Sequence, residues 1–312
     1  MFRVETQESY RFEDLTTIQH GWDFTVAQIG PADDISRVSF YQTPHVGYNK
    51  FRYGTPYDQR LSAKQGILSF GLLNIDNPNT WAYDQPIPNN ALTVFPRDDD
   101  LKAASPSGFC GNGIHLSEVF MTILAEQIYC LPLNSLMPAA GIYLPSIGKI
   151  DSIRHELLKW QQLTTYGADT RPEIISRREE NLALAVIDAL CDARAIEKDD
   201  LKKSDHSVSR ALDIIHSSKL ENISALELCK HAGCSQRSLE KGFLKKFGIT
   251  PKKYIKCLRL ARVHEGLSNF DTQGFESIIE LAGNHGFWHM GQFAADYRRI
   301  YGELPSTTLS RR

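Results

Sequence analysis

A helix-turn-helix pattern occurs twice in the last hundred residues of this 312-residue chain. The segment 228–233 is matched by 281–286, with five positions from leucine to glycine in each. The segment FLKKFGITP at 243–251 is matched by YRRIYGELP at 297–305, with aromatic residues, glycine and proline in register. The offset is 53 residues for the first match and 54 for the second, so the second turn is one residue longer. This part of the chain must therefore fold as two equivalent helical units.

The local signals in the first copy predict where its helices begin and end. Ser224 and Glu227 have the spacing of a capping box, Gly233 is placed to end that helix, and Ser235 is placed to cap the next. The expected buried residues are Leu226, Leu228 and Cys229 in the first helix and Leu239, Phe243 and Phe247 in the second. Two short helices joined by a turn with glycine describe a helix-turn-helix.

The segment 251–268 starts with proline and is predicted to form one long helix between the copies. Such a helix could hold the two units so that their second helices meet successive major grooves, about 34 Å apart on one face of DNA.

Charge divides the chain in the same way as the repeat. The net charge of −2 argues against a polyanionic partner when it is taken alone. Residues 205–312, however, contain 16 Lys and Arg against 11 Asp and Glu, a net of +5, whereas residues 1–204 contain 19 against 26, a net of −7. A basic module joined to an acidic one indicates that only the C-terminal part meets nucleic acid, although chance asymmetry is the alternative.

With the repeat and its charge, residues 207–312 closely resemble the AraC/XylS-type bacterial transcription regulators. The stretch GFWHMGQFAADYRRIYGELPS at 286–306 looks like the signature segment of that family. The first two hundred residues resemble more loosely the sensor half of such proteins, a cupin-like β-barrel followed by a helical pair that dimerises. Cupin enzymes carry metal-binding histidines in the barrel, and this chain lacks their spacing, which favours a sensor over a catalyst.

The resemblance assigns DNA contacts to both second helices. In the first motif these are Ser235, Gln236, Arg237, Glu240 and Lys241, and in the second Trp288, His289, Met290, Gly291 and Ala294. Arginine and lysine can donate to guanine, glutamate can accept from cytosine, and glutamine can read adenine or contact a phosphate. The family commonly has Ser where Gly291 stands and Arg where Ala295 stands, so we expect the first motif to give most of the base readout. Lys245, Lys246, Lys252 and Lys253 are expected either to contact phosphates or only to aid solubility.

The N-terminal sequence is β-like from Thr25 to about His115, with short apolar runs between clusters of Gly, Pro, Asn and Asp. Many short strands predict a sandwich or small barrel. A small barrel can hold one ligand, and its aromatic residues supply most of the contact area. The candidate ligand-binding residues are Tyr41, Phe51, Phe70 and Trp81.

These patterns predict an α+β chain with four parts. They are a β-rich effector-binding domain at 1–145, an antiparallel helical pair at 146–195, a linker at 196–206 and the DNA-binding domain at 207–312. A further helix is expected at 118–131, packed on the barrel. The helical pair either covers the barrel only or also forms a dimer interface.

No pattern in the chain indicates catalysis. The GxSxG, GxGxxG and Walker motifs are absent, the histidines lack metal-ligand spacing, and the six cysteines form no CxxC pair. We therefore expect no enzymatic activity, no cofactor and no metal. We also expect no membrane segment and a bacterial cytoplasmic protein that associates with the nucleoid when bound to DNA.

The expected function is a ligand-responsive, sequence-specific transcription regulator, an activator and a homodimer, with double-stranded DNA, a small-molecule effector and RNA polymerase as partners. One alternative is a regulator that responds to a partner protein instead of a small ligand. A remote alternative is a cupin-type enzyme fused to a DNA-binding module.

Overall fold

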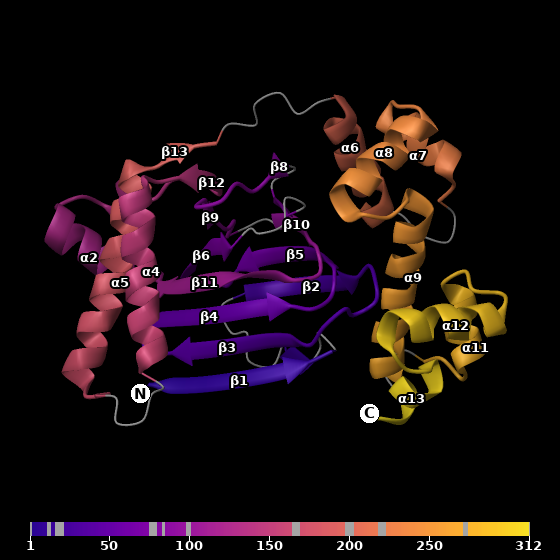
Figure 1. Cartoon of the computed structure of the whole chain (residues 1–312), viewed down its shortest axis with the longest axis horizontal. Helices are drawn as coiled ribbons and strands as arrows, with labels where there is room; N and C mark the ends of the chain where they lie inside the picture. The colour runs from indigo at the N-terminus through magenta and orange to yellow at the C-terminus, as the bar shows by residue number, and fades with distance from the viewer. Residues whose placement is uncertain are drawn as a thin grey trace.

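The chain folds into a sheet-rich N-terminal region and an all-helical C-terminal region (Figure 1). The computed structural model describes residues 2–10, 14–15, 22–74, 80–82, 85–97, 101–163, 169–196, 203–217, 223–270 and 274–311. Helices pack on one side of the sheets, and the C-terminal helices lie on the other side (Figure 1). The predicted α+β class, with strands before helix-turn-helix units, is confirmed.

The strands form two sheets. Their bounds are β1 Arg3–Ser9, β2 Trp22–Gln28, β3 Ser36–Gln42, β4 Val46–Tyr53, β5 Tyr57–Ala63, β6 Ile67–Asn74, β7 Trp81–Ala82, β8 Gln85–Pro86, β9 Leu92–Val94, β10 Leu101–Ser105, β11 Phe109–Ser117, β12 Gly141–Leu144 and β13 Arg194–Ala195. One sheet has the order β1-β3-β4-β11-β6-β9-β12-β13, and the other has the order β2-β5-β10-β7-β8.

Side chains on successive positions of a strand point to opposite faces of the sheet, and this alternation separates two cores. Phe51 and Tyr53 of β4 lie in an inner core together with residues of β5, β7 and β10 from the second sheet. Val46 and Tyr48 of the same strand pack in an outer core against helices. The larger sheet is therefore buried on both faces.

Four helices and a π-helical turn cover the outer face of the larger sheet: α2 Glu118–Leu124, η1 Ala125–Tyr129, α3 Leu133–Leu136, α4 Ile147–Gln162 and α5 Pro172–Asp192. Trp160 of α4 is fully buried in the outer core, beside Leu182 and Val186 of α5. The helices expected at 118–131 and within 146–195 are thus present, and α4 and α5 cover the sheet. Whether they also form a dimer interface stays a prediction.

The C-terminal helices are α6 Lys203–Ser217, α7 Ala225–Ala232, α8 Gln236–Phe247, α9 Pro251–Ser268, α11 Ile278–Asn284, α12 Met290–Tyr301 and α13 Pro305–Ser310. The repeat in the sequence is also a repeat in structure. Helices α8 and α12 each have 12 residues and end at a left-handed glycine, Gly248 or Gly302. Each is followed by a helix that begins with proline. The predicted capping box of Ser224 and Glu227 is confirmed.

Two local expectations were wrong. Leu226 was expected in the buried face of α7, but it is 80% exposed. Among the described side chains of this helix, Leu228 and Ala232, four residues apart, are buried, and a position two residues before Leu228 lies on another side of the helix. The segment 196–206 was expected to be a linker, but α6 already begins at Lys203. Residues 197–202 lie outside the described part of the chain.

A polar cluster lies between the sheets, beside the inner aromatic core. The Nδ1 atom of His115 is 2.9 Å from Ser69 Oγ, and its Nε2 atom is 3.3 Å from Asn49 Oδ1. All three residues are buried. Burial, with a smaller contribution from the charge of Lys64, lowers the pKa of His115 to about 3. The imidazole is therefore neutral in the folded protein at pH 7.

This shift predicts a stability that falls with acid. In the unfolded chain the imidazole of His115 takes up a proton below its ordinary pKa of about 6.5, whereas in the folded protein it stays neutral down to about pH 3. Between pH 7 and pH 5.5 this difference lowers the free energy of unfolding by about 1 kcal/mol. Urea unfolding at the two pH values measures it. His115→Gln should remove this part of the pH dependence, and the exposed His155→Gln should keep it. Equal pH dependence in both variants would contradict the assignment.

Candidate nucleic-acid interface

The second helix of the first motif, α8, is the predicted recognition helix of that motif, and it has one buried and one exposed side. Leu239 and Phe243 are buried in the C-terminal core, whereas Gln236, Arg237 and Lys241 are exposed. Ser235 caps the helix, since its side chain accepts a hydrogen bond from the backbone N–H of Ser238 at 3.2 Å. The N-terminus of α8 and its exposed donors are thus open to an anionic partner.

The polar residues of α8 are ordered relative to one another. The Nε2 atom of Gln236 donates to Glu240 Oε1 at 3.0 Å, one turn further along the helix. Glu240 is half-buried. Arg237 and Lys241 are exposed and take no part in the hydrogen bond between Gln236 and Glu240. The five positions that the sequence predicted in this motif therefore share one side and one end of α8.

The second recognition helix, α12, has a different surface. Trp288 is 79% exposed in the turn before the helix, and His289 and Gly291 are also exposed. Met290 is half-buried and packs on the C-terminal core, and Ala294 is half-buried. Exposed polar groups are therefore fewer here than on α8.

A groove of about 1,100 Å³ lies between α9 and α12. Its lining includes five cationic side chains: Lys252, Lys253, Lys256 and Arg259 of α9 and Arg299 of α12. Trp288 and His289, from the turn before α12, lie at the same groove. A cationic groove next to a recognition helix is suited to a phosphate backbone.

The carboxylate of Asp296 binds two of the cationic side chains that line this groove. It accepts hydrogen bonds from Lys256 Nζ at 2.9 Å and from Arg299 Nη2 at 2.5 Å. Burial by itself would raise the pKa of Asp296, but hydrogen bonds from Lys256 and Gln292 and the two positive charges outweigh it, so that the pKa lies below its ordinary value. The ion pair with Lys256 joins α12 to α9, whereas the ion pair with Arg299 lies within α12.

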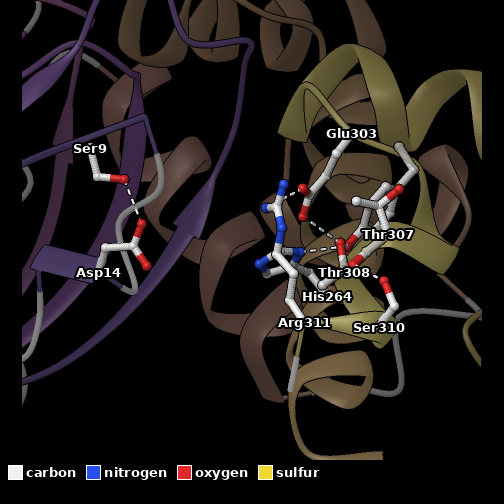
Figure 2. Close-up of polar contacts among 9 residues, drawn as sticks. Ser9, Asp14, His264, Glu303, Thr307, Thr308, Ser310 and Arg311 are labelled. Carbon is white, nitrogen blue, oxygen red and sulfur yellow. Dashed lines mark hydrogen bonds and ion pairs between the residues drawn. The ribbon is translucent and has the colours of Figure 1, made fainter.

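A second network fastens α12 and α13 to α9 (Figure 2). The hydroxyl of Tyr297 lies 2.5 Å from His264 Nδ1 and 2.8 Å from Thr308 Oγ1. Thr308 Oγ1 donates to Glu303 Oε1 at 2.8 Å, and Glu303 forms an ion pair with Arg311. His264, Tyr297 and Thr308 are buried. Buried hydrogen bonds thus join the second recognition helix to α9 and α13.

The groove contains residues that the sequence analysis missed. Lys252 and Lys253 were considered as phosphate contacts, but Lys256, Arg259 and Gln292 were not. The signal was available, because positions 252, 256 and 259 have the i, i+4, i+7 spacing of one helix face. Arg299 could not be found this way, since it comes from another helix.

Lys245 and Lys246 contact the N-terminal region. Their ammonium groups lie 5.0 and 5.5 Å from the centre of the Trp81 ring, at the distance of cation–π contacts. Both lysines belong to the last turn of α8, and Trp81 belongs to β7. The C-terminal end of the first recognition helix therefore rests on the sheet-rich region.

Trp81 also lines a cavity of about 40 Å³ between the two sheets. Of the four predicted ligand-binding residues, Phe51 and Trp81 line it, whereas Tyr41 and Phe70 pack on the opposite face of the larger sheet against the helices. The lining is mostly apolar, and two of its buried polar atoms, Trp81 Nε1 and Thr93 Oγ1, have no hydrogen-bond partner within the part of the chain that the structure describes.

The described residues contain neither a metal-binding cluster nor a membrane-spanning helix. No three His, Cys, Asp or Glu side chains gather there in an arrangement suited to a metal ion. No helix among them combines the length and the apolar character that crossing a bilayer requires.

Residues 228–311 match the family model described as a helix-turn-helix domain. The XylDLEGF operon transcriptional activator 1 of Pseudomonas putida is 38% identical over 117 residues, which are 38% of this chain and 35% of that protein. The XylDLEGF operon transcriptional activator 2 of the same species is 43% identical over 101 residues, which are 32% of this chain and 64% of that protein. The chain thus matches only about a third of the length of the first of these relatives.

Among solved structures, the AraC-like transcriptional activator CuxR is similar over 85% of this chain and 96% of its own, with 10% sequence identity and a TM-score of 0.43.

Proposed function

We propose that this chain is a transcription regulator and that its C-terminal domain is a member of the AraC/XylS family, a proposal supported by the match to a helix-turn-helix family model and by the similarity to operon activators. The protein would bind double-stranded DNA sequence-specifically and activate transcription through RNA polymerase. One observation carries the proposal: two second helices of equal length, α8 and α12, stand in a repeated motif, and a groove with five cationic side chains lies beside α12. As a DNA-binding protein it would act at the bacterial nucleoid.

The two units would read successive major grooves from one face of DNA. Helix α9 has 18 residues, which gives a length of about 27 Å, comparable to the 34 Å between successive major grooves. Arg237, Lys241 and Gln236 on α8 would contact base edges, and Lys252, Lys253 and Arg259 would neutralise the intervening phosphates. Trp288 and His289 would contribute shape and backbone contacts in the second groove.

Selection from randomised duplexes with the full chain tests this proposal. We expect a pool with two sequence blocks about one helical turn apart, and an affinity that falls steeply as salt rises. Pools without enriched sequence, or binding that is independent of salt, would contradict it.

We propose that the cavity between the sheets is the effector site. Its apolar walls, with Trp81 Nε1 and Thr93 Oγ1 unpartnered, would suit a small, mainly apolar molecule that carries a hydrogen-bond acceptor. A volume of about 40 Å³ holds only a few water molecules, so a larger ligand must move the walls. Because Trp81 is both a wall and the support of Lys245 and Lys246, this movement would reach α8.

Replacing Trp81 tests the effector site. A screen of small aromatic and aliphatic acids and phenols should contain compounds that raise the melting temperature of the wild type. Trp81→Leu should abolish that rise, whereas Lys245→Ala with Lys246→Ala should keep it and lose only the effect of the compound on DNA affinity. If no compound stabilises the wild type, control by a partner protein is favoured. A homodimer through α4 and α5 is part of the same proposal.

A further inference from the structure

Ile29 belongs to the sheet-rich region in sequence but to the helical region in packing. It directly follows β2 and is only 2% exposed. It belongs to the hydrophobic core of the C-terminal helices, whose other buried side chains come from both helix-turn-helix units and from α9. The residue next to β2 is thus an integral part of the core of the helical region.

Polar contacts on each side of Ile29 join it to two different helices. The Sγ atom of Cys257, in α9, donates to the backbone oxygen of Ile29 at 3.4 Å. The Nε2 atom of Gln28 donates to the backbone oxygen of Ile300, in α12, at 2.6 Å. Gln28 is buried, and its amide also donates to the backbone oxygen of Gly30 at 2.8 Å. One short segment therefore touches both the connecting helix and the last turn of the second recognition helix.

The segment 28–30 is also fixed to the neighbouring chain segment at residues 56 and 57. Gln28 pairs with Tyr57 in the sheet, and the backbone N–H of Ile29 donates to the oxygen of Pro56 at 3.0 Å. A Cβ atom on Gly30 would lie 2.7 Å from Pro56 Cγ, so the chain turns here where only glycine fits without displacing that ring. Because these contacts fix Gln28 and Ile29 to the sheet, we expect the helices to take their position from this segment.

The first unit is held by the same sheet at other points. Lys102 of β10 forms an ion pair with Asp213 of α6, and Asp58 Oδ2 lies 3.4 Å from His216 Nε2 of α6. Together with Trp81 beneath α8, these contacts place the first unit on the sheet. The five-stranded sheet therefore contacts both units at separate places.

We propose that Gln28 and Ile29 are specificity-determining residues that set the position of the second helix-turn-helix unit relative to the first. They would thereby determine which spacing between the two DNA sequence blocks the protein accepts. The inference rests on the proposed function, but it assigns to the N-terminal region a share in reading the operator that does not require an effector.

Spacing variants of the selected duplex test this inference. Inserting one base pair between the two sequence blocks moves the second block by about 3.4 Å and rotates it by about 35°. The wild type, held by the sheet, should lose about 10-fold or more in affinity for this duplex. Gln28→Ala and Ile29→Ala, which free the second unit, should lose only about 3-fold or less. Gln42→Ala is the matched control, since Gln42 ends another strand and, in the part of the chain that the structure describes, donates to the backbone oxygens of Thr43 and Val46 within the sheet-rich region.

The outcomes separate the two proposals. If the wild type selects no sequence at all, the proposed function fails. If the wild type binds and both variants keep its spacing penalty, the role of Gln28 and Ile29 is overturned. Gln28→Ala removes the two hydrogen bonds of the Gln28 amide and leaves the Ile29 side chain in the core, so it decides the question where Ile29→Ala does not fold. The inference would also be overturned if the inserted base pair reduced the affinity of Gln42→Ala as little as it reduces that of the Gln28 and Ile29 variants.

Discussion

Arg237→Ala should weaken binding to the selected duplex by about 1–3 kcal/mol, or about 5- to 150-fold, and relax the preference at one base pair. Arg237 is exposed in the first turn of α8, on the side away from the buried Leu239 and Phe243. Guanidinium is the side-chain group best suited to bidentate contact with guanine. Titration of the selected duplex and of its single-base variants measures both effects.

The matched control is Lys253→Ala, in the groove beside α12. If Lys253 contacts a phosphate, its loss should weaken binding to all duplexes alike and reduce the salt slope by about one charge. Arg237→Ala should differ by changing the order of preference among sequences. An Arg237→Ala protein with unchanged sequence preference would show that α8 does not read bases through this residue.

The features that could be predicted from sequence are those encoded by neighbouring residues. The capping box of Ser224 and Glu227, the glycine that ends α7 and the proline that begins α9 each act within one turn of a helix. The repetition of the glycine and the proline, at offsets of 53 and 54 residues, then revealed the two units. Local rules suffice here because each unit is built from short-range contacts.

The predictions failed where the outcome depends on which face of an element a residue occupies. Phe51 and Phe70 are both buried aromatics in strands of one sheet, yet Phe51 points into the cavity and Phe70 toward the helices. Composition does not distinguish these faces, because both are apolar when helices cover a sheet. Leu226 was misplaced for a related reason, since an apolar residue at the start of a helix need not face the core.

Contacts between the two regions could not be predicted at all. Ile29 lies 228 positions before Cys257, and Trp81 lies more than 160 positions before Lys245. Neither pair shares a motif, a period or a charge pattern. The juxtaposition depends on how the five-stranded sheet packs on the helices, which only the three-dimensional structure reveals. The groove residue Arg299 was missed for the same reason.

Tyr297→Ala should destabilise the helical region by about 3–5 kcal/mol, because it empties a fully buried site and breaks two hydrogen bonds. The ring packs against Phe293 and Tyr301 of the same helix, and the hydroxyl joins His264 of α9 to Thr308 of α13. We expect a lower unfolding midpoint in urea and a loss of DNA binding at temperatures where the wild type still binds.

Tyr297→Phe separates the packing from the polar network. It keeps the ring but leaves His264 and Thr308 without the hydroxyl, which should cost about 1–3 kcal/mol. If α12 is placed by these bonds, this variant should fold and still bind DNA more weakly than the wild type. An unchanged affinity would assign the placement of α12 to apolar packing and to the ion pairs of Asp296 instead. The network of Tyr297, His264 and Thr308 would then stabilise the C-terminal end of the chain without affecting how α12 is positioned for DNA.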